Sequence, residues 1–152
     1  RSLLFGEPVP ALSGSGWSGG VASGPLVVAN LTVASHLLGS RHVPDLEGAI
    51  LIFEDVGEAP YRIDRMLTQW RLAGLLQGLA GLGFGSFVDC EAEPLQEDQT
   101  FTLEEVLKER TADLGIPVVG QLPVGHCCGN ASFPLGREAR LDGNRGQLSL
   151  IV

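Results

Sequence analysis

Two short segments of the sequence carry side chains that could act together in a hydrolytic reaction. Glu54 and Asp55 directly follow the apolar run 49–53, and His126 lies in the segment Gly-His-Cys-Cys-Gly-Asn. A carboxylate at the mouth of a buried strand is costly to desolvate without a partner, and catalytic carboxylates tend to occupy such positions. A carboxylate that orients an imidazole is the acid–base part of a nucleophile–base–acid triad. We therefore predict that Glu54, fixed by its strand, orients His126, with Glu58 in the following turn as the rival acid.

Helical and extended segments alternate along the rest of the chain. Apolar residues recur at three- and four-residue spacing after Pro60, which is typical of a helix, and Thr102-Leu103-Glu104-Glu105 is a capping box that opens another. We expect strands at 49–53, 79–88 and 116–119, helices at about 30–38, 60–76 and 102–114, and a hairpin of 137–142 with 147–152. This alternation predicts a mixed α/β domain. The segment 1–22, rich in Gly, Ser and Pro, is interpreted as a linker or mobile leading segment before a domain at 23–152.

Composition limits the kinds of partner that the protein can have. The 152 residues suffice for one domain with its own core, and 18 acids against 10 bases give a net charge of −8. Nucleic-acid binding needs a basic footprint, and a membrane span needs about 20 consecutive apolar residues, so we expect neither partner. Three cysteines, two of them adjacent, indicate reduced thiols in a cytoplasmic protein. Because Arg1 is not Met, we interpret the chain as a piece of a longer protein.

Two further patterns are interpreted as loops without chemistry of their own. Residues 16–20 match the G-x-S-x-G nucleophile motif, but that motif requires a strand before it and a helix after it. Cys127 and Cys128 lie beside His126, yet adjacent side chains do not readily converge on one tetrahedral ion, and the sequence has no spaced Cys-x-x-Cys pair. We therefore expect no metal and no other cofactor.

The segments around Glu54 and His126 resemble the LD-carboxypeptidases of bacterial cell-wall recycling. The resembling blocks are Gly24-Pro25-Leu26 through Asn30-Leu31, ILIFEDVGEAPYRIDRMLTQ, LGFGSF, IPVVGQLPVGH and Pro134-Leu135-Gly136. The resemblance implies a two-domain serine peptidase with a Ser–Glu–His triad. Its C-terminal half is a compact β-rich domain, of the swivelling β/β/α type with outer helices, and it supplies the acid and the base, matched here by Glu54 and His126. The nucleophilic serine has no match in this chain and is expected in the N-terminal half.

The resemblance also implies the reaction and the assembly. The implied reaction releases a C-terminal D-amino acid, D-Ala, from murein tetrapeptide. The implied assembly is a cytoplasmic homodimer. Self-immunity hydrolases that cleave aminoacyl-nucleotide amides share this scaffold and triad and stay an alternative, with Trp17 as a candidate stacking residue. A non-catalytic binding domain is the other alternative. Because the serine is expected elsewhere, we predict no peptidase activity for residues 1–152 alone.

Overall fold

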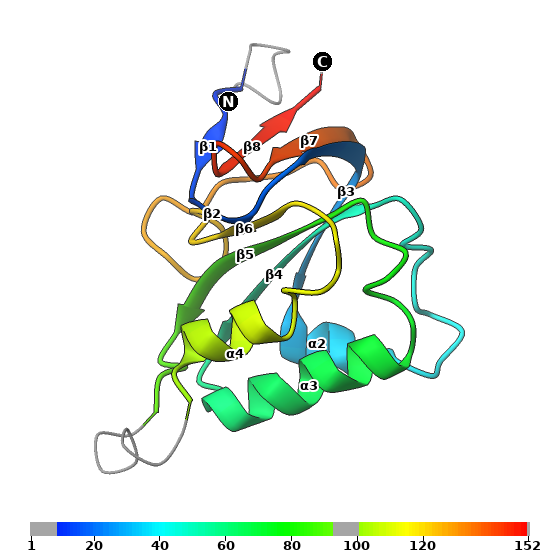
Figure 1. Cartoon of the computed structure of the whole chain (residues 1–152), viewed down its shortest axis with the longest axis vertical. Coiled ribbons are helices and arrows are strands. Elements are labelled where there is room, and N and C mark those ends of the chain that lie inside the picture. Colours follow the sequence, from blue (N-terminus) through cyan, green and yellow to red (C-terminus); the bar gives the residue numbers. More distant parts are fainter. Residues whose placement is uncertain (1–8, 93–100, 152) are drawn as a thin grey trace.

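A single curled sheet, with helices outside it, makes up the part of the chain that the computed structural model describes, residues 9–92 and 101–151 (Figure 1). Its strands are β1 (Leu12–Ser13), β2 (Ser15–Ser18), β3 (Val21–Asn30), β4 (Ile50–Val56), β5 (Gly81–Val88), β6 (Val118–Gly120), β7 (Glu138–Asp142) and β8 (Gln147–Leu150). The spatial order is β1-β8-β7-β3-β4-β5-β6-β2. Only Gly14 separates β1 from β2 in the chain, so the two edges of the sheet nearly meet. The β-rich α/β fold class expected from the sequence is confirmed.

The centre of the sheet is parallel. Strand β4 pairs in parallel with β3 on one side and with β5 on the other, and β6 continues the parallel set beyond β5. Every residue of β4 from Ile50 to Asp55 is buried. A strand covered on both faces reads as a continuous apolar run, which is why 49–53 was recognisable in the sequence.

Two apolar clusters lie on the two faces of this sheet. Leu51 and Phe53 of β4 belong to the cluster shared with the helices, whereas Ile50 and Ile52 belong to the cluster inside the curled sheet. Alternate residues of a strand point to opposite faces, so β4 contributes to both. On the helix side Phe53 packs edge-on against Trp70, with ring centroids 5.0 Å apart.

The helices of the described residues cover one side of the sheet: α2 (Leu31–Ser35), α3 (Pro60–Leu72) and α4 (Leu103–Glu109) (Figure 1). The capping box predicted at Thr102 is confirmed, and Asn30 caps α2, because its side chain accepts a hydrogen bond from the Val33 N–H. The helices end earlier than predicted, at Ser35, Leu72 and Glu109, where the chain continues in turns. No helix of the described residues is long and apolar enough to cross a bilayer.

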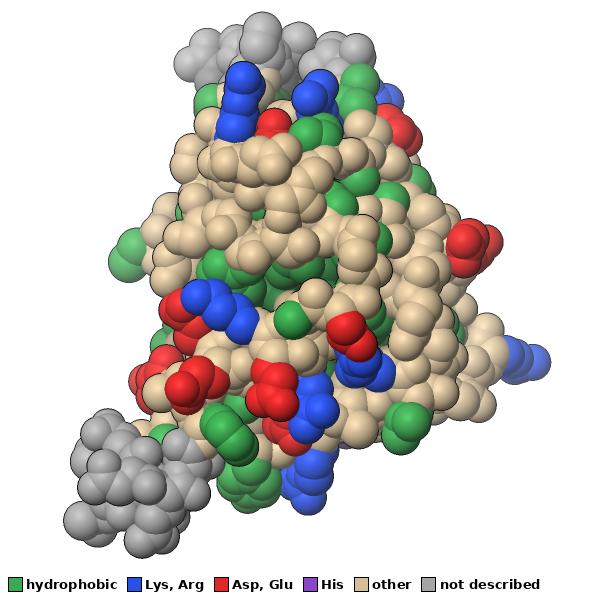
Figure 2. All heavy atoms as spheres, viewed as in Figure 1, with side chains coloured by type: hydrophobic (Ala, Val, Ile, Leu, Met, Phe, Trp, Pro, Cys, Tyr) green, Lys and Arg blue, Asp and Glu red, His purple; other side chains and the backbone are tan. Residues whose placement is uncertain are grey.

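Oppositely charged side chains are interspersed on the outer surface of α3 and α4 (Figure 2). Arg71 of α3 pairs with Asp113, and Asp64 of α3 pairs with Arg110 just after α4. These pairs link the two helices across their solvent face. Exposed pairs of this kind contribute little stability individually, so the apolar cluster beneath them holds the helices in place.

The leading segment differs from its interpretation as a linker. Leu12 pairs with Leu148 of β8, and Ser15 pairs with Gly120 of β6, so residues 12–18 supply both edges of the sheet. Trp17 packs against Phe84 with ring centroids 5.6 Å apart. Residues 16–20, which match the G-x-S-x-G motif, thus lie in and just after strand β2. Residues 1–8 of the predicted linker lie outside the described part of the chain.

Candidate active site

Glu54 lies near the carboxyl end of β4, opposite Asn30 of β3 in the parallel register. Its side chain is 8% exposed. Strand alternation places it on the same face as Ile50 and Ile52, the inner face of the curled sheet. A carboxylate in this position needs a partner to offset its desolvation.

His126 is that partner. Its Nδ1 lies 2.7 Å from Glu54 Oε2, although the two residues are 72 positions apart in the chain. The imidazole is 65% exposed, so the pair has one buried member and one open to solvent. In the tautomer in which Nδ1–H donates a hydrogen bond to the carboxylate, Nε2 carries no proton and can act as a base.

A short hydrogen-bonded loop holds His126 in this position. The Gly125 N–H donates to Asn130 Oδ1 at 3.0 Å, the Cys127 N–H donates to Gly125 O at 2.9 Å, and the Asn130 N–H donates to Cys127 O at 3.2 Å. On the other side, Ser86 of β5 donates from both its N–H and its hydroxyl to Val124 O. The loop is therefore closed on itself and attached to the sheet.

Gly125 is required by the close approach of this loop to the sheet. Its φ is +103°, and a Cβ atom built there would lie 2.7 Å from both Glu54 Oε2 and Ser86 Oγ. Any other residue at this position would collide with the acid that His126 contacts. No signal in the sequence identified Asn130 or Ser86 as supports of the loop.

The pair opens onto a cavity of about 830 Å³. Glu54, His126 and Asn130 form a polar part of its lining, and Val28, Phe133 and Leu135 form an apolar part. Leu135 is 64% exposed. A cavity of this size, mostly apolar with a few convergent polar groups, is the usual form of a small-molecule site.

Asp55, next to Glu54, has a structural environment. It is 2% exposed and accepts hydrogen bonds from Asn30 Nδ2 at 3.0 Å and from the Thr32 N–H and hydroxyl at 2.9 and 2.8 Å. Asp55 thereby ties the first turn of α2 to β4. The two neighbouring acids therefore point to opposite faces of the sheet, Asp55 to the α2 side and Glu54 to His126.

Glu58, the rival acid, lies away from His126. It sits in the turn before α3 and pairs with Arg62 at 3.5 Å, beside Arg65 and Met66 in a small surface groove. The geometry therefore brings Glu54, and not Glu58, to the histidine. Among the hydrogen bonds of the described residues, none joins a serine hydroxyl to His126.

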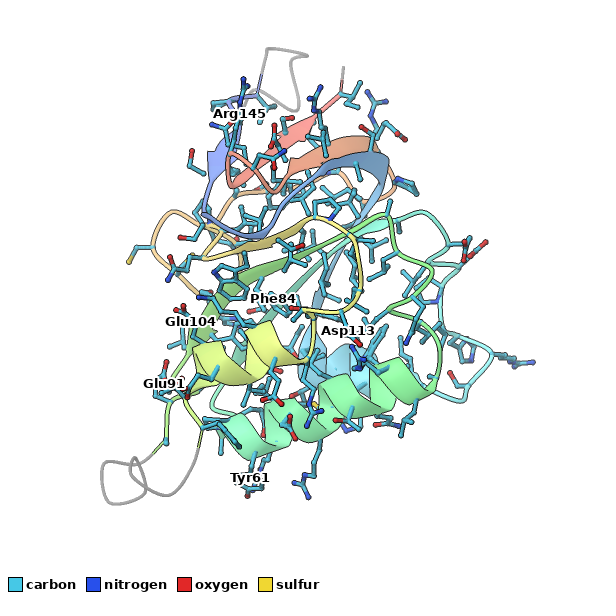
Figure 3. The ribbon with its side chains drawn as sticks, in the orientation of Figure 1. Tyr61, Phe84, Glu91, Glu104, Asp113 and Arg145 are labelled. Atoms are coloured by element: carbon cyan, nitrogen blue, oxygen red, sulfur yellow. The ribbon has the colours of Figure 1, made fainter. Side chains whose placement is uncertain are left out.

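The three cysteines have free thiols. Cys127 and Cys128 line the large cavity and also a second one of about 440 Å³. Figure 3 labels three residues that line the second cavity: Phe84 on β5, Glu104 on α4, and Glu91 after β5. In the described residues no cluster of three or more His, Cys, Asp or Glu side chains could hold a metal ion.

Comparison with known proteins places these features in a family. A family model described as the LD-carboxypeptidase C-terminal domain matches residues 23–141. A putative carboxypeptidase of Synechocystis is 51% identical over 151 residues, which are 99% of this chain and 50% of that protein. The match over most of the chain is thus to a domain of a peptidase family. The chain belongs to the LD-carboxypeptidase family, as its C-terminal domain.

Solved structures agree with this assignment. The muramoyltetrapeptide carboxypeptidase of Oxalobacter formigenes has a TM-score of 0.80 at 30% identity, over 93% of this chain and 48% of that one. The microcin C7 self-immunity protein has a TM-score of 0.74 at 21% identity, over 93% of this chain and 41% of that one, a likeness that shows the fold alone. The chain spans about half the length of these relatives.

Proposed function

We propose that the full-length protein carrying this chain is a serine-type LD-carboxypeptidase that releases D-Ala from murein tetrapeptide in peptidoglycan recycling. The observation that carries the proposal is the 2.7 Å contact of His126 Nδ1 with Glu54 Oε2 at the wall of an open cavity. Family membership and the name of the structural neighbour, a muramoyltetrapeptide carboxypeptidase, support the substrate class. We further propose that the enzyme acts as a cytoplasmic homodimer without a metal.

The proposed mechanism divides the work between two halves of the protein. A serine supplied from outside this chain attacks the carbonyl of the amide bond, and His126 Nε2 takes its proton and later donates it to the leaving amine. Glu54 accepts the Nδ1–H, which fixes the tautomer with Nε2 as the base and stabilises the imidazolium. Because Glu54 is buried, its charge acts through a less polar medium than water and is more effective.

The test uses the full-length protein and its His126→Gln variant. Transfer of the proton by a positioned base contributes about 10²–10⁴-fold to a rate, so the variant should release D-Ala from murein tetrapeptide more slowly by that factor. His42→Gln is the matched control, since His42 lies in an exposed turn and lines neither of the two cavities described above. Release at the parental rate by His126→Gln would refute the assignment of the base.

The same assay separates the alternative functions. The self-immunity protein has been solved with aspartyl sulfamoyl adenosine, which makes aminoacyl-nucleotide amides the second substrate class to offer. Trp17, the candidate stacking residue for a nucleotide, lies against Phe84, and a Cβ atom on Gly120 would be 2.0 Å from its ring. Trp17 thus packs within the fold and lines the second cavity rather than the one beside Glu54 and His126, which favours the murein peptide. Hydrolysis of the nucleotide amide alone would overturn that preference, and hydrolysis of neither substrate would favour a binding domain.

A further inference from the structure

Two adjacent thiols stand directly beside the candidate base. Cys127 is half-buried, Cys128 is exposed, and both are free. Together they form part of the wall between the two cavities, because each lines both of them. Exposed thiols next to a second thiol are the usual sites of reversible oxidation. The proposed function uses neither of them.

The loop hydrogen bonds couple these thiols to His126. Two of the three bonds that close the loop use backbone atoms of Cys127: its N–H donates to Gly125 O, and its carbonyl accepts from the Asn130 N–H. Consecutive Cα atoms lie about 3.8 Å apart across a trans peptide, closer than the roughly 4.4–6.8 Å of an ordinary disulfide. A bond between Cys127 and Cys128 therefore has to change the backbone at Cys127, and with it the two hydrogen bonds that position His126.

We propose that Cys127 and Cys128 form an oxidisable dithiol: a peroxide converts them to a vicinal disulfide that displaces His126 from Glu54, and a dithiol reductant reverses the change. The formation of the disulfide is inferred from the two cysteines and the geometry of their loop, without reference to the proposed function. Its effect on hydrolysis rests on the proposed function.

The chemistry balances with peroxide as the only oxidant. The Cys128 thiolate, the more exposed of the two, attacks one peroxide oxygen, so that an S–O bond forms, the O–O bond breaks and hydroxide leaves as water. The Cys127 sulfur then attacks the sulfenic sulfur, so that the S–S bond forms, the S–O bond breaks, and the leaving hydroxide takes the Cys127 thiol proton to become a second water. Two thiols are oxidised by two electrons and one peroxide is reduced to two waters. A disulfide between adjacent residues closes a small, strained ring. An external dithiol therefore reduces this disulfide readily.

Cys90 supplies an internal control. It is fully buried, it donates to Val88 O, and burial raises the pKa of its thiol. A buried thiol that resists ionisation reacts slowly with oxidants. The sequence also separates it from the pair, since trypsin releases Cys90 in the peptide 72–108 and the adjacent cysteines in the peptide 111–137.

The experiment treats the full-length protein with hydrogen peroxide and follows both tryptic peptides and the rate of D-Ala release. Peptide 111–137 should lose about 2 Da and resist alkylation, whereas peptide 72–108 should stay unchanged. The rate should fall roughly tenfold or more and return after treatment with a dithiol. The Cys128→Ser variant should show no reversible loss of rate on peroxide treatment. Its treated rate is compared with the rate of the same variant before treatment. Cys90→Ala should stay as sensitive as the parent.

Several outcomes would overturn the proposal. Peptide 111–137 without the mass loss, or with added oxygen in place of it, would show that no vicinal disulfide forms. A disulfide that leaves the rate unchanged would show that the bond does not act on His126. If the parent hydrolyses neither substrate, the proposed function fails, while the mass measurement still decides whether the dithiol exists.

Discussion

Replacing Gly125 with alanine should separate Glu54 from His126 while leaving both side chains present. The added Cβ atom would lie 2.7 Å from Glu54 Cβ, Glu54 Oε2 and Ser86 Oγ, whereas ordinary van der Waals contact begins at 3.4 Å. The loop must therefore retreat by about 0.7 Å, because Glu54 Cβ is fixed by β4. The 2.7 Å contact between Nδ1 and Oε2 then lengthens beyond the range of a strong charge-assisted hydrogen bond.

The expected loss of activity follows from this displacement. A misplacement of about 1 Å can cost on the order of 10²-fold in rate, so Gly125→Ala should slow D-Ala release by the full-length protein roughly 10- to 100-fold. Gly129→Ala is the matched control on the same loop. Its φ is +82°, comparable with +103° at Gly125, but a Cβ atom there meets nothing within 4 Å. Both variants carry the cost of a left-handed alanine, about 1–3 kcal/mol, and only one carries the collision.

The rates of D-Ala release by the two variants show whether the collision with Glu54 matters, and their thermal midpoints compare the cost to stability. The reasoning is refuted if Gly125→Ala keeps the parental rate, because the close approach to Glu54 would then be dispensable. It is also refuted if both variants lose activity equally, because the backbone conformation of the loop, rather than the approach to Glu54, would then be responsible.

Three further changes test what stabilises the domain that carries the site. Asp55→Ala should lower the free energy of unfolding by about 1–3 kcal/mol, since it leaves three half-buried donors without their acceptor; a urea midpoint close to that of the parent would contradict this. Thr102→Ala removes the cap of α4 and should cost about 1 kcal/mol in the same measurement. Hydrogen bonds from Thr102 lower the pKa of Glu105, so the stability that Glu105 adds is present above its ordinary pKa of 4.5 and is lost as the pH falls through the lowered value. Glu105→Gln should therefore differ most from the parent near neutral pH and least in acid, as urea unfolding across pH will show.

The central strands and the helices were predictable because their signals are local. A continuous apolar run marks β4, which is buried on both faces, and the caps at Asn30 and Thr102 mark the starts of α2 and α4. Strands β1 and β2 carried no such signal. Their partners lie at least 100 residues away, as in the pairings of Leu12 with Leu148 and of Ser18 with Val118, and their Ser- and Gly-rich composition is that of a loop. Pairing at that distance, and not local preference, makes them strands.

The candidate site divides along the same line. Glu54 and His126 each stand out locally, one as an acid in an apolar strand and the other as a histidine in a turn, and the structure brings them to 2.7 Å. The residues that support the pair, Asn130 and Ser86, have no such local signal. The Asn130 side chain reaches back to the Gly125 N–H, and Ser86 holds Val124 from another strand. These contacts depend on how the loop meets the sheet, which no spacing in the sequence encodes.

The alternation of β4 explains why two neighbouring acids have such different surroundings. Leu51 and Phe53 point toward the helices, and Asp55 continues that series to meet the first turn of α2, where backbone and hydroxyl donors surround it. Ile52 points into the curled sheet, and Glu54 continues that series to the rim, where the loop brings an imidazole. An acid saturated by donors of its own domain has no capacity left for a reaction. An acid with one titratable partner at a cavity keeps that capacity, which is the physical reason to assign the chemistry to Glu54.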